Sequence, residues 1–243
     1  MSAPTYLSYK DVRFSKKYPY SYLLGGSPKI DKSNERTKYA NFIMYLAPSD
    51  ISGYNVCPKA SAGCIAGCLN TAGRGIYDRT QRARINRTKD YVENRLQFLQ
   101  RLDFEIGRKY RRYGELTRIR LNGTSDISWN PFIKKMVDKY EGLEFYDYSK
   151  VKKRAIESLN IKGYHVTFSK SESNWDECVQ VLNAGVNVAV VFRKYFPFKY
   201  KGFPVISGDF TDARYLDPKG GYIVALKAKG PAKKDTSGFV VDL

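Results

Sequence analysis

The sequence predicts an α/β protein: a partial (βα) barrel of about six mainly parallel strands with outer helices, preceded by an irregular N-terminal arm. Three observations support this. Short apolar runs alternate with helical patterns through the second half of the chain. The 243 residues are 42% hydrophobic and 27% charged, as in an ordinary globular protein. No apolar run reaches the roughly eighteen residues that span a membrane. We expect an arm over residues 1–40 and a single domain over residues 41–243.

The N-terminal arm is basic and rich in tyrosine. Its tyrosines, which interleave with lysines and arginines, are Tyr6, Tyr9, Tyr18, Tyr20 and Tyr22. The run Gly25-Gly26-Ser27-Pro28 is expected to break any regular element. The arm therefore either extends along nucleic acid or clasps the main domain through its tyrosines. Because the first residues lack the apolar core of a signal peptide, we expect a cytoplasmic protein.

The first half of the domain holds a strand, a loop and a long helix. Residues 41–47 form an apolar run that Pro48 stops, which is typical of a buried strand. Residues 78–112 show a helical pattern with an apolar stripe at Ile85, Val92, Leu96, Leu99, Leu102 and Ile106. The opposite face is basic and carries Arg79, Arg82, Arg84, Arg87, Lys89, Arg95 and Arg101.

The second half repeats strand and helix. Strands are expected at 116–121, 143–148, 164–168 and 187–192, and helices at 131–140, 151–159 and 174–183. Two further strands follow at 204–207 and 222–226. Such alternation favours a parallel sheet with helices outside. Cys178 shares a helical stripe with Val181 and Leu182, so we expect it to be a buried packing residue.

Two of these strands place polar residues on one face. Arg118, Arg120 and Asn122 alternate in one strand, as do His165, Thr167 and Ser169 in the other. Parallel strands covered on both faces are normally apolar throughout. The polar face predicts either a lumen lined for a ligand or a few satisfied polar groups inside a filled barrel.

The loop after the first strand carries three of the four cysteines. Cys57, Cys64 and Cys68 are spaced C-x6-C-x3-C among small residues. Thiolates are soft ligands, and three on one flexible loop suit an iron–sulfur cluster, with zinc as the alternative. The other interpretation, three small buried residues in a turn, fits poorly with a chain that has one other cysteine.

Polar residues also follow the later strands, at the edge where βα barrels place their active sites. They include Asn122, Asp126, Asp147, Ser169 and Asp209, which we predict as ligand contacts, together with Glu172 and Asp212. Any one of them alone is more simply a helix cap. No residue is assigned a catalytic role.

The net charge of +18, from 42 Lys and Arg against 24 Asp and Glu, favours a polyanionic partner, DNA or RNA. Arg79, Arg82 and Arg87 are the predicted nucleic-acid contacts. A solvated basic surface or a docking face for a host protein would give the same charge.

A strand, a three-cysteine loop and repeated βα units resemble the radical S-adenosylmethionine superfamily over residues 41–226. The resemblance implies a [4Fe-4S] cluster on the three thiolates, with one iron free for S-adenosylmethionine. It also places Asn122 and Asp126 beside the methionyl amine. The superfamily's usual spacing is C-x3-C-x2-C, and this loop differs from it.

At finer grain the chain resembles the phage proteins grouped as the gene product 88 family. The shared segments are C-P-K-A-S-A-G-C, C-L-N-T-A-G-R-G, R-L-N-G-T-S-D-I-S-W, F-Y-D-Y-S-K and A-L-K-A-K-G. This resemblance implies a phage origin and an infected host cell, and it carries no reaction.

Together these features predict a phage iron–sulfur protein, similar to radical S-adenosylmethionine enzymes, that acts on nucleic acid or a nucleotide. Two alternatives remain. One is a non-catalytic nucleic-acid-binding protein whose iron–sulfur or zinc site is structural, with Cys178 or His165 as fourth ligand. The other is a phage effector that binds a host protein. An open fourth position separates the catalytic from the structural site.

Overall fold

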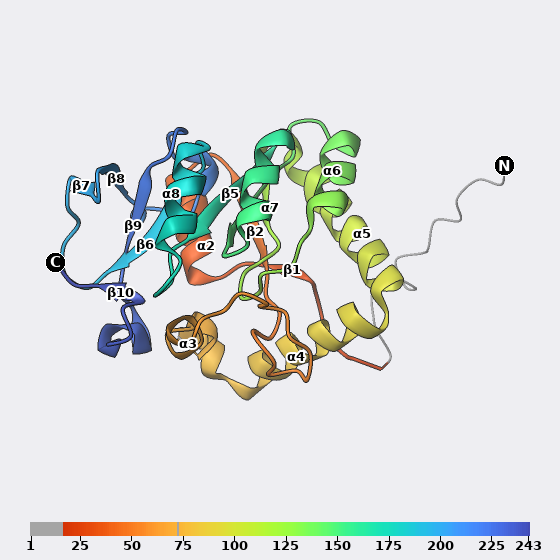
Figure 1. The fold of residues 1–243 in the computed structure, drawn as a ribbon. Coiled ribbons are helices and arrows are strands. Elements are labelled where there is room, and N and C mark those ends of the chain that lie inside the picture. The colour runs from red at the N-terminus through yellow and green to blue at the C-terminus, as the bar shows by residue number, and fades with distance from the viewer. Residues whose placement is uncertain (1–16, 72) are drawn as a thin grey trace.

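The computed structural model, which describes residues 17–71 and 73–243, is built on one mostly parallel sheet (Figure 1). Its parallel strands are, in spatial order, β2 (Ala40–Met44), β3 (Thr117–Arg120), β4 (Glu144–Ser149), β5 (Tyr164–Ser169), β6 (Val188–Phe192), β9 (Ile223–Lys227) and β8 (Phe203–Ser207). The predicted α/β class and mainly parallel sheet are confirmed.

Short strands extend this sheet. β1 (Leu24–Gly25) pairs antiparallel with β2, and β7 (Lys199–Tyr200) pairs antiparallel with β8. The strand order runs from β1 to β7, so the described strands form an open sheet. β10 (Val240–Val241) pairs in parallel with the end of β6 and brings the C-terminal segment to that edge.

The helices that follow the parallel strands lie close to their predicted positions. α6 (Asn130–Lys139), α7 (Lys152–Glu157) and α8 (Trp175–Asn183) follow β3, β4 and β5. They occupy the top of the view in Figure 1, whereas α3 (Ala62–Ala66) and α4 (Asp78–Glu93) lie together at the bottom. Cys178 of α8 is fully buried beside Val181, which confirms the packing role predicted for it.

The prediction of one helix over residues 78–112 is wrong. α4 ends at Glu93, Asn94 leaves the helical conformation with φ −125° and ψ 43°, and α5 (Arg95–Tyr113) begins there. The expected apolar stripe is interrupted, because Val92 and Leu96 are 40% and 72% exposed. A buried ion pair holds the two helices instead: Arg101 Nη1 lies 3.2 Å from Asp90 Oδ2. Arg101 is therefore buried, and Arg84 is buried where it donates to the Asn70 carbonyl, so the expected basic outer face loses both.

Part of the N-terminal arm clasps the domain. Tyr6 and Tyr9 lie outside the described residues, but Tyr20 is 6% exposed and donates a hydrogen bond to Asp90 at 2.5 Å. The Gly25–Pro28 run separates β1 from α2 (Pro28–Arg36), as expected, but the arm predicted to be irregular over residues 1–40 contains this helix. Ser27 caps this helix by accepting from the Ile30 amide, and the fixed φ of proline suits a first helical position.

The polar inner face of the sheet differs between its two ends. Near the strand starts, Glu144 lies 3.3 Å from Arg118 Nε and 3.1 Å from His165 Nε2. His165 and Thr167 also line a cavity of about 280 Å³ at this end. Near the strand ends the same face borders two cavities, which involve Arg120 and Tyr148. The polar face thus borders a cavity at each end, and the strand starts also hold polar groups that pair with one another.

Candidate metal centre

The cysteine loop owes its conformation to small residues and a carboxylate. Ser61 caps α3 by accepting from the Cys64 amide at 3.2 Å. Glu172, just beyond β5, accepts from the Ser61 hydroxyl and from the Gly63 amide. A Cβ at Gly63 would lie 2.5 Å from Ser237 Oγ and 2.7 Å from Glu172 Oε1, so only glycine fits. The loop is therefore locked to the sheet and to the C-terminal segment.

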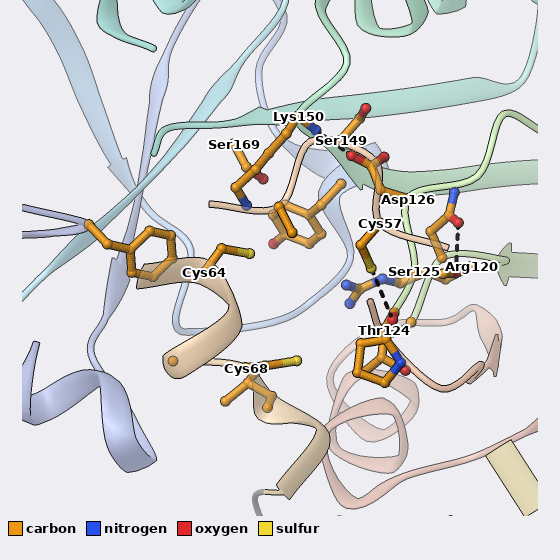
Figure 2. Close-up of a pocket in the computed structure, with 18 residues that line it drawn as sticks. Cys57, Cys64, Cys68, Arg120, Thr124, Ser125, Asp126, Ser149, Lys150 and Ser169 are labelled. Carbon is orange, nitrogen blue, oxygen red and sulfur yellow. Dashed lines mark hydrogen bonds between the residues drawn. The ribbon is translucent and has the colours of Figure 1, made fainter. Parts of the chain in front are cut away.

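The three loop cysteines line one cavity of about 230 Å³ at the carboxyl ends of the parallel strands. Figure 2 shows Cys57, Cys64 and Cys68 around the same space, with Ser169 and Lys150 across from them. All three thiols are half-buried and free of disulfides. The strand order and the loop position thus bring together the residues that the sequence predicted as ligands.

Burial and neighbouring charges affect the ionisation of the Cys57 and Cys68 thiols. Burial raises the pKa of Cys57 and of Cys68, and in each case the neighbouring Cys64 thiol raises it further. Lys150 opposes both effects by favouring the thiolates. Thiols that resist ionisation are stabilised as thiolates when they bind a cation, because coordination replaces the proton.

The thiols border the cavity without converging on one point. Among residues 17–71 and 73–243, no three His, Cys, Asp or Glu side chains are grouped closely enough to hold a metal ion. Cys178 and His165, the two expected fourth ligands, do not line the cavity. Cys178 lies in the core, and His165 is at the start of β5, where it contacts Glu144.

Two predicted ligand contacts belong to a buried hydrogen-bond network. Asn122 and Asp147 are 2% and 0% exposed. Asn122 donates to the Asp147 carboxylate from its backbone amide, and its side-chain carbonyl accepts from the Ile127 amide and the Ser125 hydroxyl. Asn122 also lines the cysteine cavity, whereas Asp147 does not. The network shapes the loop after β3.

Asp126 joins two further loops at the same edge. Its carboxylate accepts from the Lys150 amide at 2.8 Å and forms an ion pair with the buried Arg154. Its own amide donates to the carbonyl of Val56, the residue before Cys57. Asp126 therefore positions the cysteine loop and borders the cavity.

The last two predicted ligand contacts, Ser169 and Asp209, lie in different places. Ser169 at the end of β5 lines the cavity. Asp209 does not: it lies 2.9 Å from Lys229 Nζ and accepts from the Lys227 amide at 3.1 Å. The expected convergence of the strand ends fails for Asp209 because β9 separates β8 from β6. Asp212, three residues later, returns to the sheet and pairs with Arg120 at 2.7 Å.

Sequence reasoning missed the contribution of the C-terminal segment. Phe239 lines the cavity, and Lys150 Nζ stands 5.6 Å from its ring centroid. Lys170 donates to the Gly238 carbonyl, which holds this segment beside β5. No local pattern around Phe239 signals this role, since it depends on the pairing of β10 with β6.

The three predicted nucleic-acid contacts on α4 differ in how far they are exposed. Arg79 and Arg82 are exposed. Arg87 is half-buried, and its guanidinium donates to the carbonyls of Tyr22 at 2.8 Å and Tyr45 at 3.4 Å. Arg87 thus holds the N-terminal segment against the sheet, and two of the three residues present their charge to solvent.

The fold and the cavity define a protein of the parallel α/β class with a three-cysteine site at the carboxyl edge of its sheet. Residues 22–243 match the model of the family described as Gene product 88, and the chain belongs to that family. The predicted resemblance to the gene product 88 family is confirmed. Comparisons with curated proteins and with solved structures gave no match. Within the described residues, no helix is both long and apolar enough to cross a membrane.

Proposed function

We propose that this protein is an iron–sulfur protein of the radical S-adenosylmethionine type, acting on nucleic acid or a nucleotide. The observation that carries the proposal is the position of the three thiols. They come from one loop, directly after the first parallel strand, and they border one cavity at the carboxyl edge of the sheet. Active sites of βα folds lie at this edge.

The arrangement of the donors favours a [4Fe-4S] cluster over zinc. A structural zinc site is closed by four protein ligands, whereas the resembling superfamily holds its cluster on three thiolates. Neither Cys178 nor His165 lines the cavity, which leaves a fourth position open to a ligand.

The chain's own residues would bind the ligand of that open position. When bound, the cluster would supply an electron to S-adenosylmethionine. Lys150 offers a cation for a carboxylate, and Ser169 offers a hydroxyl, both on the cavity wall. Asn122 and Asp126 support the wall by fixing the loops after β3 and β4. In this proposal the open sheet corresponds to a partial barrel, as in the resembling superfamily.

The basic surface supports a nucleic-acid partner. The excess of 18 positive charges is partly displayed on α4, where Arg79 and Arg82 are exposed. Cationic faces bind polyanions by releasing their counterions. We place this partnership in the cytoplasm of an infected host cell, where thiols stay reduced. A non-catalytic nucleic-acid-binding protein with a structural metal is the second candidate, favoured by the same exposed arginines.

Anaerobic purification followed by metal analysis tests the proposal. We expect a brown protein with about four irons per chain. Cys57→Ala, Cys64→Ala and Cys68→Ala should each lose the colour, and the matched variant Cys178→Ser should keep it. Calorimetric titration of the brown protein with S-adenosylmethionine then tests the open position. A colourless protein with one zinc would overturn the cluster, and a brown protein without S-adenosylmethionine binding would leave the second candidate.

A further inference from the structure

A second and larger cavity adjoins the one lined by the cysteines. Its volume is about 890 Å³, and we call it the arginine chamber. The two cavities share five lining residues: Leu69, Arg120, Gly123, Thr124 and Tyr148. The far wall comes from β1 and the start of α2, the segment that Arg87 holds against the sheet. Cavities of about 300–1,000 Å³ are the usual size for small-molecule ligands.

Positive charge dominates the described lining of this chamber. Four arginines border it, Arg74, Arg84, Arg87 and Arg120, against two acids, Asp31 and Asp212. Of these four, Arg120 is the one for which the described residues supply an ion-pair partner, Asp212 at 2.7 Å. A concave site with several guanidinium groups concentrates anions.

Three of these arginines lie against tyrosine rings, and the Arg87 guanidinium is 5.7 Å from the Tyr20 ring centroid. The Arg84 guanidinium is 4.7 Å from the Tyr45 ring centroid, and the Arg120 guanidinium is 4.7 Å from that of Tyr148. Figure 2 shows Arg120 among the side chains around the cysteine cavity, so this pair stands at the junction of the two spaces. Each stack orients the planar guanidinium fork.

The same side chains carry buried polar atoms without partners. Arg84 is 7% exposed and its Nη1 donates to the Asn70 carbonyl at 2.9 Å, but its Nε has no hydrogen-bond partner among the described residues. Within that part of the chain, Arg120 Nε and the Tyr148 hydroxyl are also unpartnered. A buried donor without an acceptor costs about 1–3 kcal/mol, so such groups normally have a partner in the functional state.

Charge favours an anionic partner in particular. Burial lowers the pKa of Arg84 and of Arg87, which means that their charged forms gain from an added anion. For Arg120, burial acts in the same direction, but the Asp212 carboxylate and the neighbouring tyrosines together outweigh it and raise the pKa. Phosphate matches oriented guanidinium groups, because its oxygens accept two parallel N–H bonds from one fork.

We propose that the arginine chamber binds the phosphate of a mononucleotide, with Arg84 and Arg120 as its main contacts. The inference rests on the proposed function for the statement that the nucleotide is the substrate. The chamber has the volume of a small-ligand site, and the α2–β1 wall limits it on one side, which favours a mononucleotide over a polymer. Tyr45 and Tyr148 supply ring faces on which a base can stack. The shared wall brings the bound nucleotide next to the cysteine cavity.

Calorimetric titration of the anaerobically prepared full chain tests this assignment. The probes are adenosine, guanosine, cytidine and uridine 5′-monophosphates, and the matched nucleosides without phosphate. We expect at least one monophosphate to bind about tenfold or more tightly than its nucleoside, since one charge-assisted pair contributes about 1.5–3 kcal/mol. Arg84→Met and Arg120→Met should each weaken the monophosphate about tenfold and leave the nucleoside unchanged.

Two further variants keep the test independent of folding and of the cluster. Arg74 is exposed, so Arg74→Met should fold normally and still weaken binding of the monophosphate. Arg111→Met, at an exposed position of α5 that does not line the chamber, should leave that binding unchanged. Equal binding of nucleoside and monophosphate, or full affinity in Arg74→Met and Arg84→Met, overturns the assignment. Binding of a single-stranded oligonucleotide alone overturns it in favour of a polymer. A colourless protein that binds the monophosphate refutes the cluster and leaves the chamber assignment intact.

Discussion

Asn122 donates two hydrogen bonds to Asp147, from its backbone amide at 2.7 Å and from its side-chain amide at 3.2 Å. The Tyr164 hydroxyl donates a third at 3.3 Å. The pair connects the end of β3 to the middle of β4 beneath the wall of the cysteine cavity. Burial raises the pKa of Asp147 to about 7, although these donors favour its charged form. Stability of the wall is therefore linked to pH.

Asp147 is expected to make the protein less stable as the pH rises. Its folded pKa of about 7 lies above its ordinary value of 3.8, so between these values the folded state holds a proton that the unfolded state has released. The free energy of unfolding should fall by about 3–4 kcal/mol from about pH 4 to about pH 7. Urea unfolding of wild type and Asp147→Asn at several pH values measures this. Identical pH slopes in the two proteins would contradict it.

Asp126→Ala is expected to destabilise the protein. The substitution leaves the buried Arg154 without its carboxylate and frees the Lys150 amide. Removing one partner of a buried ion pair costs about 3–5 kcal/mol. Thermal unfolding with a calorimeter gives the change, and Asp138→Ala on α6 serves as a surface control. A variant as stable as wild type would show that Asp126 is free to bind ligand.

Glu172 is expected to act as a positioning residue for the cysteine loop. In Glu172→Gln the amide cannot accept from both Ser61 and Gly63, so the segment with Cys64 loosens. Groups that orient metal ligands typically change affinity about 10–100-fold. With the proposed cluster bound, we expect iron to pass to a chelator about tenfold faster, with little change in melting temperature. Asp176→Asn, an exposed neighbour, is the control, and equal release rates in all three proteins would refute the role.

The four cysteines are expected to differ in reactivity in protein that has been treated with a metal chelator. Cys57, Cys64 and Cys68 are half-buried, whereas Cys178 is fully buried and burial raises its pKa to about 12. The thiolate is the form that alkylates. Iodoacetamide followed by mass spectrometry should label the three loop cysteines of the folded protein and spare Cys178. Labelling of all four at one rate would show that the core around α8 opens.

The arginines of α4 are expected to affect different properties. Arg79→Glu with Arg82→Glu should reduce the salt dependence of oligonucleotide binding, by about 0.9 in log–log slope for each phosphate that is no longer neutralised. Arg87→Glu should lower the melting temperature, because its guanidinium holds the Tyr22 and Tyr45 carbonyls. Fluorescence anisotropy against salt and thermal unfolding separate the two effects. A slope unchanged in the double variant would count against a nucleic-acid surface on α4.

The sequence by itself determined the fold class and the position of the cysteine loop. Both depend on local patterns: strands and helices alternate within short windows, and the C-x6-C-x3-C spacing lies within one loop. Because parallel strands end at one edge, their order along the chain was enough to predict that Asn122, Asp126 and Ser169 would meet the cysteines. The burial of Cys178 followed from its helical stripe.

The tertiary structure decided what depends on contacts between distant residues. The break at Asn94 accompanies the burial of Arg101 against Asp90 and Tyr20, and no window around Asn94 contains Tyr20. The insertion of β9 between β6 and β8 moves Asp209 away from the cavity, because strand order is set by pairing and not by sequence order. Likewise, Arg84 and Arg120 line the same arginine chamber only because packing brings α4 and β3 together. Local patterns indicate which side chains each element presents, and long-range packing determines which of them line the same cavity.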